Sequence, residues 1–216
     1  MLVYTIKELC RTCYTCVREC PARAIRIVGG QAEVIDDRCV ACGNCTKVCS
    51  QGAKVFTNTV DLVRKLIEKG GKVAAIVAPS FPAEFHDVTD HKKIVSMIRA
   101  LGFSYVSEVS FGADLVAHHY YNLVSDTHVK NYISSDCPAI VTFIRFYHPD
   151  LTDNLIPVVS PMVAMTRVMR QKYGEDLPVV FIGPCVAKKA ENAEVDVAIT
   201  FLELREMFDA AGINPE

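Results

Sequence analysis

From residue 72 onward, short apolar runs alternate with longer amphipathic segments. The apolar runs predict buried strands at Val73–Ala78, Tyr105–Val109, Asn131–Ser134, Val179–Ile182 and Val195–Ile199. The segments between them place apolar residues at helical spacing and predict helices at Lys92–Leu101, Ala113–Val124, Ala139–Phe146, Val163–Lys172 and Leu202–Ala211. Because short apolar strands alternate with helices, we expect an α/β layer with a parallel sheet and helices on both of its faces.

Residues 1–57 follow a different pattern and contain an internal repeat. Ile6 matches Ile35 and Ala24 matches Ala53, so the two copies are offset by 29 residues. Each copy predicts a short strand, a loop, a helix of one or two turns and a return strand. We therefore expect three parts: an α+β module at residues 1–57, a connecting helix at 58–71, and an α/β domain at 72–216.

Cysteines occupy the loops of both repeats. The first ladder is Cys10-x-x-Cys13-x-x-Cys16-x-x-x-Cys20, and the second is Cys39-x-x-Cys42-x-x-Cys45-x-x-x-Cys49. This is the spacing of bacterial ferredoxins that hold two 4Fe–4S clusters, in which the fourth cysteine of each ladder ligates the other cluster. The predicted ligand sets are therefore crossed between the two ladders. One cluster would be held by Cys10, Cys13, Cys16 and Cys49, and the other by Cys39, Cys42, Cys45 and Cys20.

Disulfides and structural zinc are the alternatives to clusters for these cysteines. Disulfides need an oxidising compartment and are typical of small secreted domains. Structural zinc sites take cysteines in pairs rather than in runs of four. Since the complete ladder occurs twice, clusters explain the pattern better than either alternative.

Composition narrows the class of protein. Half of the 216 residues are hydrophobic, yet no apolar run is long enough to span a bilayer, so we expect no membrane span. The first residues lack the basic leader and long apolar segment of a signal peptide, which favours a cytoplasmic location. The formal net charge of −2 gives no indication of nucleic-acid binding.

Two further cysteines follow predicted strands of the α/β domain. Cys137 follows Asn131–Ser134 and precedes Pro138, and Cys185 follows Val179–Ile182 and Pro184. Each would lie at the carboxyl end of a strand, near a helix N-terminus that favours thiolate. Buried structural cysteines are the alternative. Together, behind a two-cluster module, the pair predicts a third metal site at one edge of the sheet.

These motifs, in order, resemble the catalytic domain of the [FeFe]-hydrogenase family. The resemblance covers nearly the whole chain and rests on the following stretches: Ala78-Pro79-Ser80, Phe111-Gly112-Ala113-Asp114, Ser135-Asp136-Cys137-Pro138, Ser160-Pro161-Met162 and Gly183-Pro184-Cys185-Val186-Ala187-Lys188-Lys189-Ala190-Glu191. In that family four cysteines hold the cubane of the H-cluster, and Cys137 and Cys185 match the first two. Lys188 matches a lysine that donates to a cyanide of the di-iron unit; the alternative is a surface lysine.

The sequence departs from the family in two respects. The family's last two ligands lie in a later Cys-x-x-x-Cys motif, and no cysteine follows Cys185 here. We therefore expect the first lobe of a hydrogenase-like domain, an N-terminal fragment or a half-size relative, with an incomplete third site. The residue before the first ligand is a proton-carrying cysteine in active members, and here it is Asp136. In the helix where the family places relay glutamates, this chain has His118 and His119.

The sequence thus predicts an iron–sulfur electron-transfer protein related to slow or hydrogen-sensing hydrogenases, inactive as this chain alone. A redox protein or a sensory domain would be its partner. The alternative is a non-enzymatic iron–sulfur protein with only two clusters, whose later domain serves as a docking or signalling scaffold.

Overall fold

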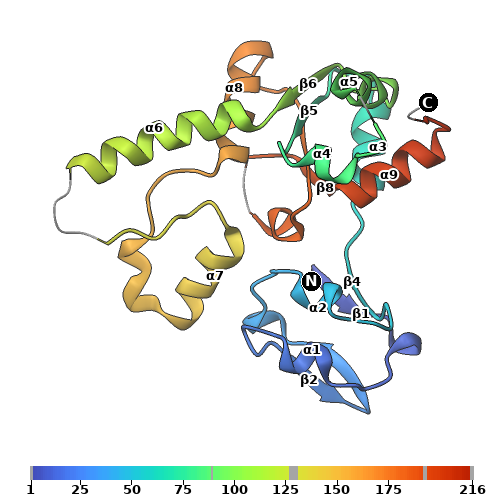
Figure 1. Ribbon diagram of the computed structural model, residues 1–216, viewed down its shortest axis with the longest axis vertical. Helices are drawn as coiled ribbons and strands as arrows, with labels where there is room; N and C mark the ends of the chain where they lie inside the picture. Colours follow the sequence, from blue (N-terminus) through green and yellow to red (C-terminus); the bar gives the residue numbers. More distant parts are fainter. Residues whose placement is uncertain (1, 89, 127–130, 192–193, 215–216) are drawn as a thin grey trace. The chain divides into compact units, whose positions relative to one another are not determined.

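The computed structural model describes residues 2–88, 90–126, 131–191 and 194–214 (Figure 1). It divides into two compact units, each assembled from separate parts of the chain. The first unit consists of Met1–Thr57, Tyr132–Leu155 and Cys185–Glu191, and the second of Asn58–Asn131, Ile156–Pro184 and Asn192–Glu216. The cysteine ladders, Cys137 and Cys185 therefore all belong to the first unit.

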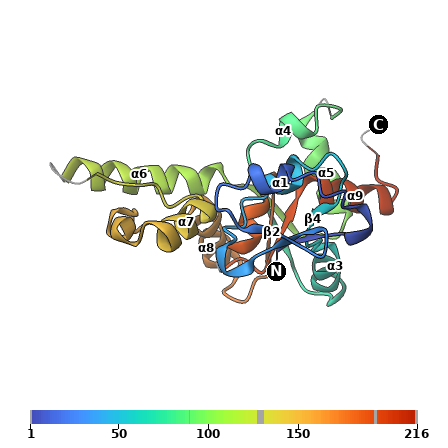
Figure 2. The same cartoon turned by 90° about the horizontal axis from the view of Figure 1, so that it is seen from below.

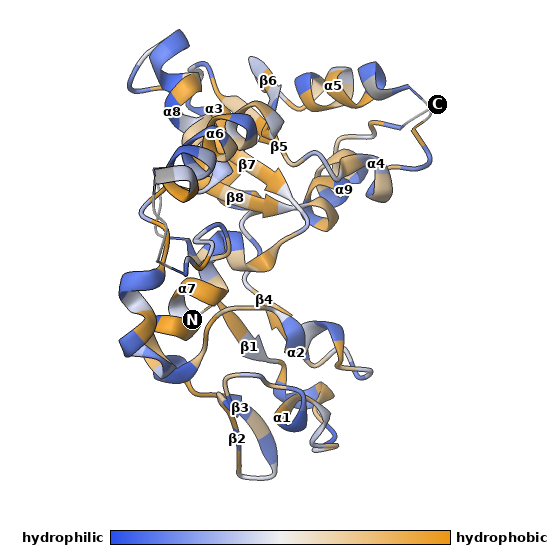
Figure 3. Ribbon diagram, turned by 60° about the vertical axis from the view of Figure 1, so that its left-hand side comes forward, coloured by the Kyte–Doolittle hydropathy of each residue, from blue (hydrophilic) through white to orange (hydrophobic). Residues whose placement is uncertain are grey.

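The second unit is built on a four-stranded sheet in the order β6-β5-β7-β8, in which every neighbouring pair is parallel. The strands are β5 (Ala74–Val77), β6 (Tyr105–Glu108), β7 (Val179–Gly183) and β8 (Val197–Thr200). All residues of β5, β7 and β8 are buried, and these strands are predominantly apolar (Figure 3). Successive side chains of a strand point to opposite faces of the sheet. Because every residue of these strands is buried, both faces of the sheet are covered.

Helices α3 (Val60–Glu68), α4 (Phe81–Glu84), α5 (His91–Ala100), α8 (Pro161–Tyr173) and α9 (Phe201–Ala210) contribute to the apolar core around this sheet. Helix α6 (Ser110–Asp126) packs against α8. A capping box starts α9, since Glu203 accepts from the backbone N–H of Thr200 at 2.7 Å and donates its own N–H to the Thr200 hydroxyl. No helix in the described part of the chain is both long and apolar enough to cross a membrane.

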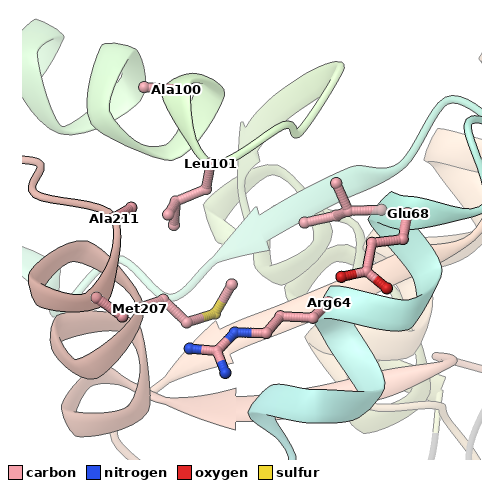
Figure 4. Close-up of a pocket in the computed structure, with 8 residues that line it drawn as sticks. Arg64, Glu68, Ala100, Leu101, Met207 and Ala211 are labelled. Carbon is pink, nitrogen blue, oxygen red and sulfur yellow. The ribbon is translucent and has the colours of Figure 1, made fainter.

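The strand order reverses between β5 and β7. From β5 the chain crosses to β6 on one side, and it later returns to β7 on the other side of β5. Right-handed crossovers then place α5 and the α6–α8 region on opposite faces. On one face α3, α5 and α9 come together around a pocket, with Arg64 and Glu68 facing Leu101 and Met207 (Figure 4). In open α/β sheets, a reversal of strand order such as that between β5 and β7 leaves a crevice at the carboxyl ends of the two strands.

Most predicted elements of residues 58–216 are confirmed, and one is wrong. The expected strand at Asn131–Ser134 contributes only a single bridge, between Ile133 and Leu155, and no strand of the sheet. Residues 132–134 of this segment belong to the first unit, whereas the strands of the sheet belong to the second. Cys137 therefore does not follow a sheet strand, whereas Cys185 does come two residues after β7.

The first unit contains two antiparallel ribbons, and Figure 2 shows one strand of each from below, β2 (Ile25–Val28) and β4 (Lys54–Phe56). Its elements are β1 (Val3–Thr5), η1 (Lys7–Leu9), α1 (Thr15–Arg18), β2 (Ile25–Val28), β3 (Gln31–Val34), η2 (Asp36–Arg38), α2 (Asn44–Lys47), β4 (Lys54–Phe56), α7 (Pro138–Tyr147), η3 (Pro149–Asn154) and η4 (Val186–Ala190). Strand β1 pairs with β4, and β2 pairs with β3. Each ribbon takes one strand from each repeat, so neither repeat forms a closed structure by itself.

Gly112 of α6 marks a close approach to α8 in the second unit. A Cβ atom at this position would collide with the carbonyl oxygen of Pro161 and press against Met165. In the sequence this glycine stands in Phe111-Gly112-Ala113-Asp114, so part of that motif is explained by helix packing.

Gly112→Ala is expected to destabilise the second unit by about 1–3 kcal/mol because of overpacking, although alanine normally favours a helix over glycine. Gly71→Ala is the matched control, since a Cβ there meets no atom within 4 Å. Thermal unfolding followed by circular dichroism measures both variants. Equal midpoints for Gly112→Ala and Gly71→Ala would contradict the close packing.

Candidate iron–sulfur sites

The two cysteine loops adopt left-handed backbone conformations at matching positions. Thr12 (φ 54°) corresponds to Ala41 (φ 57°), and Tyr14 (φ 63°) corresponds to Gly43 (φ 74°). Left-handed conformations cost non-glycine residues roughly 1–2 kcal/mol each. In the described part of the chain, all four non-glycine residues with positive φ fall in residues 12–41, within or beside the ladders. Strain of this kind gathers at functional loops, where it turns the backbone around a bound group.

The first cavity brings together three cysteines of the first ladder and one of the second. Cys10, Cys13, Cys16 and Cys49 line it, together with Thr5, Ala32, Ala53 and Lys54. Cys10 follows η1 directly, and α1 carries Cys16 inward, so the loop wraps the cavity. Cys49 comes from the loop after α2, so this cavity is lined by cysteines of both ladders.

The second cavity repeats the arrangement with the ladders exchanged. Cys39, Cys42, Cys45 and Cys20 line it with apolar side chains that include Val3, Ile25, Val34 and Val40. Two backbone N–H groups already donate to sulfur, that of Ala24 to Cys20 Sγ at 3.2 Å and that of Ala41 to Cys39 Sγ at 3.4 Å. Hydrogen bonds to sulfur are one of the means by which a protein sets the potential of a cluster.

The thiols differ in their surroundings. Burial raises the pKa of Cys45 to about 11, and it also raises the pKa values of Cys16 and Cys39. A hydrogen bond with the Thr15 hydroxyl, 3.5 Å from Cys13 Sγ, instead lowers the pKa of the exposed Cys13 thiol. Metal ligation requires thiolate, so binding of a cation would offset the cost of ionising the buried thiols.

The donor sets fit 4Fe–4S clusters better than the two alternatives. All ten cysteines are free thiols, so none is joined in a disulfide. Within the described ranges, no three His, Cys, Asp or Glu side chains are grouped so that they could hold one metal ion. Four thiols instead line each of two cavities, which is the number of ligands that a 4Fe–4S cluster takes.

Helix α7 and η4 pack around the second cavity. Ala139 of α7 and Ala187 of η4 are buried in one cluster with Ala22, Ala24 and Val40, against Cys20, Cys39 and Cys42. The Tyr147 hydroxyl at the end of α7 donates to the carbonyl oxygen of Ala22 at 2.7 Å, with that of Arg38 at 3.1 Å. Gly43 packs tightly against η4, because a Cβ there would lie 3.1 Å from Cβ of Val186. These contacts hold the loops of the second cavity against the two segments that follow Cys137 and Cys185.

Cys137 and Cys185 occupy equivalent positions on these segments. Each is the N-cap residue, of α7 and of η4, and both have extended backbones, with φ −100° and −96°. Both side chains are exposed, which excludes the alternative of buried structural cysteines. The Lys188 ammonium donates to the carbonyl oxygen of Asp136 at 2.9 Å and pairs with Glu191 at 2.5 Å. Lys188 therefore ties the start of α7 to η4 and is not a surface lysine.

The remaining candidates for proton transfer are less constrained. The Asp136 carboxylate is half-buried and accepts from the Ser134 hydroxyl at 3.0 Å. His118 and His119 lie on α6 and are exposed, and His118 Nε2 is 3.3 Å from the Asn122 amide. Their exposure favours surface roles for the two histidines.

Comparison with known families decides the classification. A model described as "Iron only hydrogenase large subunit, C-terminal domain" matches residues 71–216. The chain belongs to this family. A second model, "4Fe-4S dicluster domain", matches residues 2–50. The chain is therefore a hydrogenase-related iron–sulfur protein that binds 4Fe–4S clusters.

Individual relatives of this hydrogenase-related chain agree with the classification. NADP-reducing hydrogenase subunit HndD of Solidesulfovibrio fructosivorans is 28% identical over 97% of this chain and 43% of its own length. Iron hydrogenase 1 of Clostridium pasteurianum is 29% identical over 59% of this chain and 25% of its own length. The structure of apo [FeFe]-hydrogenase HydA1 from Chlamydomonas reinhardtii shares the fold, with a TM-score of 0.57 and 24% identity over 71% of this chain and 48% of that chain. The chain spans less than half the length of each.

Some residues of the candidate sites belong to no sequence motif that would identify them. Tyr147 is one, since nothing in an amphipathic helix indicates which tyrosine reaches a distant carbonyl. Lys54 is another: it is only 3% exposed and lines the first cavity. The repeat could have indicated Lys54, because the matching residue in the first copy is the apolar Ile25 and a lysine at the same position is unexpected.

Tyr147→Phe is expected to lower stability by about 0.5–1.5 kcal/mol, because its hydroxyl no longer bonds to the loops of the second cavity. Tyr121→Phe is the control, since Tyr121 is 72% exposed. Thermal loss of the cluster absorbance in the loaded protein measures both. Indistinguishable midpoints would show that the Tyr147 hydroxyl does not hold the cavity loops in place.

Proposed function

We propose that this chain is an iron–sulfur electron-transfer protein related to [FeFe]-hydrogenase, with two 4Fe–4S clusters in residues 1–57. Such clusters supply one-electron transfer at low potential. The observation that carries the proposal is the crossed grouping of eight cysteines around two cavities. Cys10, Cys13, Cys16 and Cys49 would hold one cluster, and Cys39, Cys42, Cys45 and Cys20 the other.

The packing of the first unit supports a route for electron transfer from the first cluster, through the second, to Cys137 and Cys185. The second cavity lies against Ala139 and Ala187, each two residues from Cys137 or Cys185. An electron on the second cluster would thus be next to the segments that carry these two thiols. The first cavity, with the exposed Cys13, would face the external redox partner.

A third site at Cys137 and Cys185 is the finer part of the proposal. The two exposed thiols at equivalent N-caps support it, as does Lys188, which is held between Asp136 and Glu191. Its chemistry in the family would be 2H⁺ + 2e⁻ ⇌ H₂. Asp136 would hold the proton where active members have a thiol, and a slow or sensory reaction follows from that replacement. The thiols of this chain amount to half of the family's ligand set.

A two-cluster protein without a third site is the competing function. Its later part would then be a docking or signalling scaffold. Iron content separates the two: about eight irons per chain fits two clusters alone, and more requires a third site.

Cys20→Ser tests the crossed ligand sets. The substitution is expected to remove or alter the cluster of the second ladder and to spare that of the first, because Cys20 lines the second cavity. Cys16→Ser is the matched variant and should have the opposite effect. Electron paramagnetic resonance of the reduced protein distinguishes the two clusters. Loss of the first-ladder signal in Cys20→Ser would contradict the assignment.

A hydrogen assay tests the third site. Residues 1–216, loaded with clusters and supplied with a synthetic di-iron precursor, are expected to evolve no hydrogen above background from reduced methyl viologen. Two thiols alone would anchor the site weakly, and proton delivery is itself worth about 10²–10⁴-fold in rate. Gas chromatography provides the measurement. Sustained turnover that is lost in Cys185→Ser would show that this chain holds a working site.

A further inference from the structure

Lys54 is a buried cation in the interior of the cluster-binding module. Lys54 is the first residue of β4 and is only 3% exposed, although its side chain ends in an ammonium group. The ammonium donates to the Thr5 hydroxyl at 2.6 Å and to the carbonyl oxygen of Ala32 at 3.4 Å. Among the residues that the structure describes, no carboxylate pairs with it. Buried lysines are rare without a compensating negative charge, so this one needs an explanation.

The internal repeat shows that the fold itself does not require a lysine here. Thr5 and Lys54 face each other across the β1–β4 ribbon. The pair in the other copy of the repeat is Val34 and Ile25, which face each other across the β2–β3 ribbon. Val34 and Ile25 are both buried and apolar, at 6% and 7% exposure. One half of the module therefore carries an apolar pair at the position where the other half carries a hydroxyl and a cation.

The cation lies where it can act on both cluster sites. Lys54 lines the first cavity with Cys10, Cys13, Cys16 and Cys49. Cys45 of the second set packs against the same small core as Cys16, Ile25 and Ala32, and Ala32 accepts from Lys54.

We propose that Lys54 is a buried counter-charge shared by the two cluster sites, which raises the reduction potential of both clusters. The inference rests on the proposed function, since it requires both clusters. A cluster with four thiolates is anionic, and reduction adds one further negative charge. In a medium of low dielectric, a fixed cation stabilises that added charge more than the same cation would in water. Net charge near the cluster is among the factors that set its potential.

The test replaces the cation in two ways that preserve the packing. The double variant Thr5→Val with Lys54→Ile copies the apolar pair that the fold already accommodates at Val34 and Ile25. Lys54→Gln removes the charge and keeps a hydrogen-bond donor. Both are expected to shift both midpoint potentials to more negative values in an anaerobic redox titration followed by electron paramagnetic resonance.

Two controls separate charge from packing. Lys54→Arg keeps the cation and should leave both potentials closer to those of the parent than either neutral variant does. Lys47→Gln removes an exposed lysine within the second ladder, and its effect should be smaller because water screens that charge. Potentials unchanged in Lys54→Gln, with both clusters bound, would overturn the proposal and leave Lys54 as a structural link. A shift confined to one cluster would overturn the shared role.

Cluster assembly gives a second criterion. If both neutral variants lose their clusters and Lys54→Arg retains them, the need for a cation is supported. Loss in all three variants would contradict an electrostatic role and assign Lys54 to packing. Iron content of the parent is measured first: fewer than about eight irons per chain would contradict the proposed two-cluster function itself, independently of any variant.

Discussion

The crossed pairing of two cysteine ladders is the constraint on which the first unit depends. Three cysteines spaced three residues apart enclose one side of a cavity, and the fourth is carried by α1 or α2 toward the other cavity. The strands follow the same rule, because each antiparallel ribbon takes one strand from each repeat. Neither cavity closes unless both repeats are folded. Cluster binding and folding of this module are therefore expected to be coupled.

Two departures from the symmetry of the module give its two cavities different surroundings. At the second cavity Gly43 replaces the bulkier Tyr14 of the first copy, which admits Val186 of η4. That cavity is then covered by α7 and η4, the segments that follow Cys137 and Cys185. At the core, Lys54 replaces Ile25 and introduces the buried cation. The repeat thus supplies two similar cluster sites, and its departures from symmetry give them different surroundings.

Much of this arrangement could be predicted from local sequence signals. Ladder spacing, the repeat, and alternating apolar runs such as Val179–Ile182 indicate chemistry and secondary structure because these depend on near neighbours. The sequence did not indicate that residues 132–155 leave the sheet-bearing unit and join the cluster-binding one. Contacts such as that of Tyr147 with Ala22 join residues far apart in the chain, and no periodicity reports them. The expected strand at Asn131–Ser134 is wrong for the same reason, since a strand exists only where a partner strand meets it.

Diffraction from anaerobically grown crystals of the loaded protein, measured at the iron absorption edge, tests the central claim most directly. The account predicts two compact groups of anomalous peaks within residues 10–49. Cys49 should ligate the group held by Cys10, Cys13 and Cys16, and Cys20 the group held by Cys39, Cys42 and Cys45. Anomalous density with each ladder closed on its own cluster, or a single iron on each ladder, would contradict it.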